Sequence, residues 1–91
     1  MALDSYRKDR TGLALVIRPD RLVVAHVAPG SPAEAARWRV GEEIVSINGR
    51  AIDAAYNASD LWKWRYQPSG TKVRMTMSHG EVRHLVLADY D

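Results

Sequence analysis

The stretch APGSPAEAARWRVGEEIVSINGR, from Ala28 to Arg50, decides the fold. Its Pro-Gly step ends an extended segment, and Ser31 followed by Pro32 predicts the capped start of a helix of about two turns. An apolar strand is expected over 42–47, because it closes in the tight turn that Asn48-Gly49 favours. The stretch specifies backbone geometry and contains no residue pair equipped for catalysis.

The flanking sequence predicts further strands and one more helix. Four segments have the β-branched or alternating composition of strands: 12–17, 21–28, 71–78 and 81–88. Asn57 or Ser59 can cap a second helix, which runs to about Gln67 before Pro68 stops it. The order predicts an α+β fold, in which a bent antiparallel sheet or partial barrel of about five or six strands is capped by two helices.

Alternation along these segments also predicts the core. The residues expected to be buried are Leu22 or Val23, Val27, Ile44, Ile47, Leu61, Val73, Met75 and Leu87.

Composition limits the class of protein. A chain of 91 residues is large enough for one hydrophobic core, and the absence of cysteine excludes a disulfide framework and a thiolate metal site. No apolar run approaches the roughly 20 residues that a membrane span requires. The net charge is only +2, and the aromatic and basic residues of 62–66 would point all round a helix, so nucleic-acid binding is disfavoured.

No catalytic or metal site is expected. The three histidines lack metal-ligand spacing and are predicted to be one half-buried and two surface residues. No serine lies in a Gly-x-Ser-x-Gly turn, and Glu42 and Glu43 face opposite ways on a strand. The segment DRTG at Asp9 to Gly12 departs from Asp-Thr-Gly by an inserted Arg10. The chain is therefore predicted to be no enzyme and to use no cofactor.

The segment VAPGSPAEAARWRVGEEIVSINGRAI resembles the core signature of PDZ domains of the bacterial type. The resemblance extends from about Tyr6 to the C-terminus. It departs from the family where Arg37-Trp38 replace Gly-Leu and where Glu42 replaces Asp. As the replacement for that leucine, Trp38 is expected to be mostly buried.

The resemblance implies a non-catalytic module that binds a C-terminal or extended peptide by β-strand addition. GLAL at Gly12 to Leu15 lies where the family has its carboxylate-binding loop, so the amides of Leu13, Ala14 and Leu15 are the expected donors. Arg10 or Lys8 would assist the carboxylate. The peptide-binding residues expected from the resemblance are Gly12, Leu13, Ala14, Leu15, Val16, Ala58, Trp62 and Arg65.

A narrower resemblance concerns the parent protein. The lead-in YRKDRTGLAL and the ending VLADYD are similar to PDZ domains that lie C-terminal to retropepsin-like aspartic protease domains in bacterial proteins. This implies that residues 1–91 are one domain with a flexible lead-in over 1–10, cut from a larger protein that is periplasmic or envelope-associated. The expected partners are a peptide, a protein C-terminus or the protease domain of the same chain. The alternative is a structural PDZ domain whose occluded groove serves packing or dimerisation.

Overall fold

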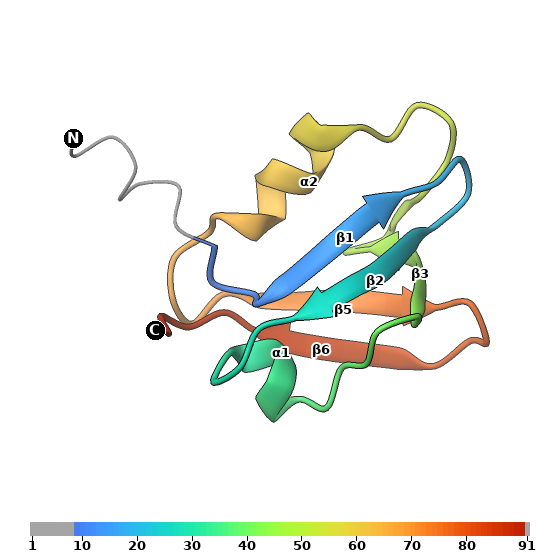
Figure 1. Ribbon diagram of the computed structural model, residues 1–91. Helices are drawn as coiled ribbons and strands as arrows, with labels where there is room; N and C mark the ends of the chain where they lie inside the picture. The colour runs from blue at the N-terminus through green and yellow to red at the C-terminus, as the bar shows by residue number, and fades with distance from the viewer. Residues whose placement is uncertain (1–8, 91) are drawn as a thin grey trace.

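The computed structural model describes residues 9–90 and shows an open antiparallel sheet with two helices (Figure 1). The strands are β1 (Leu13–Ile17), β2 (Leu22–Val27), β3 (Glu43–Ile47), β4 (Arg50–Ala51), β5 (Lys72–Met77) and β6 (Val82–Val86), and the helices are α1 (Pro32–Ala35) and α2 (Ala58–Arg65). The strands follow the order β1-β2-β3-β5-β6, with β4 paired to β3. The predicted α+β class is confirmed, and β1 is an edge strand.

Both helices begin at the caps that the sequence indicates. The Ser31 hydroxyl accepts a hydrogen bond from the Glu34 amide at 3.2 Å, while the Asn57 side chain and Asp60 form a reciprocal capping box. Each helix is shorter than expected. Helix α1 ends before the predicted two turns because Arg37 adopts a left-handed conformation with φ of 65°.

The core lies between the sheet and the two helices. Of the residues predicted to be buried, Leu22, Ile44, Ile47, Leu61, Val73, Met75 and Leu87 are confirmed. Val27 packs against the core but stays partly exposed, so it is less buried than predicted.

A bulge in β2 breaks the alternation on which these predictions rest. Ala14 pairs with His26 and Leu15 pairs with Val24, so Ala25 is an extra residue. Strict alternation would turn His26 to the same side as Val24, but the bulge leaves His26 exposed. All three histidines are exposed, and the prediction of a half-buried histidine is wrong.

Trp38 is 4% exposed, which confirms its predicted burial. The Arg83 guanidinium lies 4.2 Å from the centroid of the Trp38 ring and donates to Glu42 at 2.9 Å and to the Ala36 carbonyl at 2.6 Å. The other carboxylate oxygen of Glu42 accepts from the Arg39 amide at 2.5 Å. The two departures from the family pattern, Trp38 and Glu42, therefore share one partner in Arg83.

The start of β1 packs tightly against the cap of α1. The Ala33 amide donates to the Thr11 carbonyl at 3.0 Å, and the Ala28 amide donates to the Gly12 carbonyl at 2.8 Å. Gly12 has φ of +81°, and a Cβ added to it would lie 2.1 Å from the Ser31 hydroxyl oxygen. Only glycine fits this position, because both the backbone conformation and the space exclude a side chain.

Gly12→Ala should therefore lower the free energy of unfolding by about 2–5 kcal/mol, the sum of a left-handed backbone penalty and local overpacking. Gly30→Ala is the matched control, because Gly30 has φ of +72° and no heavy atom within 4 Å of an added Cβ. That variant should lose only about 1–2 kcal/mol. Urea denaturation of both variants measures the difference, and equal losses would show that contact with Ser31 is unimportant.

Candidate peptide groove between β1 and α2

The outer edge of β1 presents backbone groups that β2 does not use. In the hairpin formed by β1 and β2, the Arg18 amide donates to the Arg21 carbonyl at one end, and the Ala28 amide donates to the Gly12 carbonyl at the other. Because hydrogen-bonded and non-hydrogen-bonded pairs alternate in an antiparallel ladder, the backbone groups of Leu13, Leu15 and Ile17 face away from β2.

Helix α2 lies along this edge (Figure 1), and Arg65 fixes which of its faces is turned toward β1. The Arg65 guanidinium donates to the Leu13 carbonyl. Ala58 lies two turns before Arg65 and Trp62 lies one turn before it, so helical spacing places both on this side of α2. Leu61 is buried, as expected, and so is Trp64, whereas Trp62 is 48% exposed.

The remaining predicted groove residues take different positions. The Leu13 side chain is fully buried, and its amide donates to the Thr11 hydroxyl at 3.0 Å. Ala14 and Val16 alternate with the outward-facing positions, so their backbone groups face β2. The Val16 side chain is on the opposite face of the sheet from Leu15.

Of the two basic residues expected to assist a carboxylate, the structure describes Arg10 alone. Arg10 donates to Asp89 at 2.7 Å and to the Gln67 carbonyl at 3.3 Å. Lys8, like the rest of residues 1–8 of the expected lead-in, lies outside the described residues. Within the lead-in, Asp9 and Arg10 are hydrogen-bonded to the body of the domain.

Asp9 lies at the Arg65 end of β1, and the sequence reasoning missed its role. Its Oδ1 accepts from the Thr11 amide at 2.8 Å and from the Thr11 hydroxyl at 2.6 Å. Its Oδ2 accepts from the Gly12 amide at 3.3 Å, from Arg65 at 3.3 Å and from the Tyr90 hydroxyl at 3.2 Å. The available signal was an Asp two residues before a Thr, a spacing at which an Asp side chain bonds the backbone.

These donors determine the charge state of the cluster. Burial would raise the pKa of Asp9, but the Thr11 hydroxyl and amide, the Arg65 charge and the Gly12 amide together hold that pKa below its usual value. Burial and the adjacent Asp9 charge raise the pKa of Tyr90. At neutral pH Asp9 is therefore a carboxylate and Tyr90 a hydrogen-bond donor to it.

A hollow of about 250 Å³ continues the line of β1 beyond Ile17. Ile17, Arg18 and Pro19 line one side, and Asp53, Ala54 and Tyr56 line the other. The two ends of the β1 edge thus differ. Arg65 closes the Leu13 end, whereas the Ile17 end borders this hollow.

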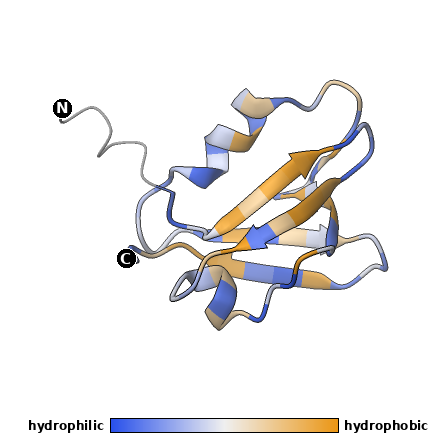
Figure 2. Cartoon of the chain, in the orientation of Figure 1, coloured by the Kyte–Doolittle hydropathy of each residue, from blue (hydrophilic) through white to orange (hydrophobic). Residues whose placement is uncertain are grey.

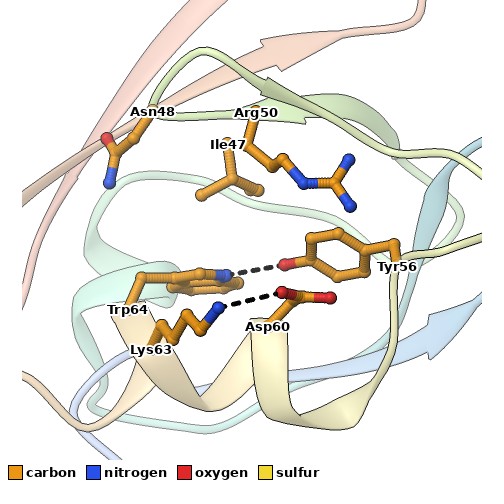
Figure 3. A pocket seen from close by; sticks show the side chains of 7 residues that line it. All are labelled: Ile47, Asn48, Arg50, Tyr56, Asp60, Lys63 and Trp64. Carbon is orange, nitrogen blue, oxygen red and sulfur yellow. Dashed lines mark hydrogen bonds and ion pairs between the residues drawn. The ribbon is translucent and has the colours of Figure 1, made fainter.

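A second hollow, of about 320 Å³, lies on the other side of α2 (Figure 3). Trp64 and Lys63 face Ile47 and Arg50 across it, with Tyr56 at one end. The Trp64 indole donates to the Tyr56 hydroxyl at 3.0 Å, while Lys63 pairs with Asp60 and Arg50 pairs with Asp53. Its polar side chains are already bonded to other groups of the domain, which is the pattern of a structural contact between α2 and the turn after β3.

Two further classes of site are absent from residues 9–90. In that range, no group of three or more histidine, aspartate or glutamate side chains is placed to hold a metal ion. No helix in the same range has the length and apolar character needed to cross a membrane.

Comparison with known proteins gives a family and a fold. The family model for the PDZ domain matches residues 1–78. The PDZ domain of a carboxy-terminal protease from Vibrio cholerae, solved in complex with peptide, is similar with a TM-score of 0.68 at 18% identity, covering 86% of this chain and 91% of that one. The photosystem II D1 C-terminal processing protease has a TM-score of 0.70 at 22% identity over 91% of this chain, which spans 24% of that protein. A search of curated proteins found no match.

The Asp9 cluster predicts a pH-dependent stability. Because the pKa of Asp9 is lower in the folded state than its unfolded value of about 3.9, its contribution is present above about pH 4 and is lost as the pH falls further. Asp9→Asn should lower the free energy of unfolding by about 1–2 kcal/mol at pH 7.

This difference from the wild type should shrink between about pH 4 and pH 2. The measurement is urea denaturation at pH 7, 4, 3 and 2. Asp20→Asn is the control, since Asp20 is exposed and pairs with its neighbour Arg21. A gap between wild type and Asp9→Asn that stays constant over this pH range would contradict the assignment.

Proposed function

This chain belongs to the PDZ family, and from that premise we propose that it binds an extended peptide by adding it as a strand to the open edge of β1. PDZ domains are interaction modules without catalytic activity. The observation that carries the proposal is the outward-facing backbone of Leu15 and Ile17 beside α2.

The edge supplies both components of strand recognition. Leu15 and Ile17 each offer one amide and one carbonyl to a guest strand, and these hydrogen bonds would give affinity without regard to sequence. Their side chains are partly buried and pack against the core, and Figure 2 shows β1 as apolar along most of its length. Trp62 and Ala58 on α2 would form the opposite wall and select apolar side chains.

Similarity supports the same use of the groove. The Vibrio cholerae PDZ domain was solved in complex with peptide, and this chain shares its fold. Peptide recognition is therefore the function that agrees best with both the open edge of β1 and the family.

Association with a protease is the second part of the proposal. Both similar structures come from carboxy-terminal or C-terminal processing proteases, which supports a role in presenting substrates to a protease domain of the parent chain, or in regulating it. The retropepsin-like parent expected from the lead-in remains a prediction, since neither of these structures is described as that type. An Asp-Thr-Gly or Asp-Ser-Gly motif encoded upstream of Met1 would support it.

A structural PDZ domain with an occluded groove is the alternative, and one observation favours it. Arg65 reaches from α2 to the Leu13 carbonyl and to Asp9, so one end of the groove is already bridged. In that case the domain would serve packing or dimerisation, and peptides would bind weakly or not at all.

The Trp62→Ala variant separates these functions. If Trp62 forms a wall, wild type binds a fluorescein-labelled library of apolar peptides saturably, and the variant binds the same peptides about tenfold more weakly. If Trp62 fills the groove, wild type binds little and the variant gains binding. Fluorescence anisotropy is the measurement.

Lys63→Ala is the matched control, because Lys63 is on the same helix but lines the hollow on its other side. That variant should bind like the wild type. Absence of saturable binding by wild type and by Trp62→Ala alike would contradict peptide recognition by this chain.

A further inference from the structure

The end of the groove where a guest C-terminus would be held already contains a carboxylate. Asp9 accepts five hydrogen bonds, two at Oδ1 and three at Oδ2. The donors include two consecutive loop amides, a hydroxyl and a guanidinium, which is the set that recognition of a chain terminus requires.

Two of the three amides expected to bind a guest carboxylate are not available to it. The Leu13 amide donates to the Thr11 hydroxyl, and the alternation of the ladder turns the Ala14 amide toward β2. Of the three expected donors, the Leu15 amide alone faces the guest. One amide is insufficient to replace the water that solvates a carboxylate, because a buried charge needs several hydrogen bonds.

Within residues 9–90, the two guanidinium groups near this end are paired as well. Arg65 is bound to Asp9 and to the Leu13 carbonyl, and Arg10 is bound to Asp89 and Gln67. A guest carboxylate at this end would approach the negative charge of Asp9 and would find both neighbouring guanidinium groups paired with other carboxylates.

We propose that Asp9 takes up the donors just before the carboxylate-binding loop, namely the Thr11 and Gly12 amides and Arg65, and that the groove therefore selects extended segments from within a polypeptide rather than free C-termini. This inference rests on the proposed function. The guest pairs with Leu15 and Ile17, continues into the hollow lined by Arg18 and Asp53, and turns away from the domain before it reaches Arg65. Asp9 is thus the residue that determines which class of peptide is bound.

The test compares three forms of the same peptides. Hits from a library of apolar heptapeptides are synthesised with a free C-terminal carboxylate, with a C-terminal amide, and with a Gly-Gly-Ser-Gly extension. Wild type should bind all three forms with dissociation constants within about twofold of one another, because the Leu15 amide alone cannot hold a carboxylate and Arg65 and Arg10 are paired elsewhere. Asp9→Ala frees the Thr11 and Gly12 amides and Arg65, so the free-acid form should then bind at least about fivefold more tightly than the amide.

Two further variants make the result specific. Asp9→Asn keeps the shape of the side chain but removes its charge, and it should shift the preference toward the free acid if Asp9→Ala does not fold. Asp20→Ala removes an exposed carboxylate in the turn after β1 and should leave the three affinities as they are in wild type.

The outcomes also distinguish this inference from the proposed function. A wild-type preference for the free acid of fivefold or more would overturn the inference and leave peptide binding intact. Equal binding of the three forms by both Asp9 variants would overturn it too, because the freed donors would then hold no carboxylate. If no form binds to any variant, peptide binding itself fails, and the inference fails with it.

Discussion

The groove depends on the hydrogen bonds and the ion pair that the Asp9 carboxylate forms. This carboxylate joins three parts of the chain, namely the loop before β1, helix α2 through Arg65, and the C-terminal segment through Tyr90. With the bond from Arg65 to the Leu13 carbonyl, it holds the end of α2 against the start of β1. The closure of one end of the edge follows from this cluster, whereas the buried Leu61 and Trp64 also hold α2 in position. The negative charge stays in place because its donors outweigh the cost of burial.

An open edge strand is usually a liability, because its unpaired amides and carbonyls can pair with other chains. Here α2 lies along β1 and the Arg65 bridge shortens the exposed part of the edge to the stretch around Leu15 and Ile17. A short edge beside a helix limits uncontrolled sheet extension and would still accept the one guest strand of the proposed function. The arrangement therefore accounts for both the family function and the restriction that Asp9 adds to it.

Local patterns in the sequence predicted much of the fold and part of the groove. The caps at Ser31 and Asn57, the burial of Trp38 and the edge position of the first strand follow from short motifs and from the family resemblance. The Asp9 cluster could not be predicted this way, because its partners Arg65 and Tyr90 lie 56 and 81 residues away along the chain. The bulge at Ala25 could not be predicted either, because a run of β-branched residues does not indicate where a strand gains an extra residue.

Amide hydrogen exchange, measured by NMR on the ¹⁵N-labelled domain with and without a saturating peptide, tests whether a guest strand pairs with β1 while Asp9 keeps its amide partners. The account predicts that the amides of Leu15 and Ile17 exchange at least about tenfold more slowly in the complex, because a guest strand covers them. The amides of Thr11 and Gly12 should keep the same exchange rates, since Asp9 occupies them in both states. Slowed exchange at Thr11 and Gly12, or unchanged exchange at Leu15 and Ile17, would contradict the account.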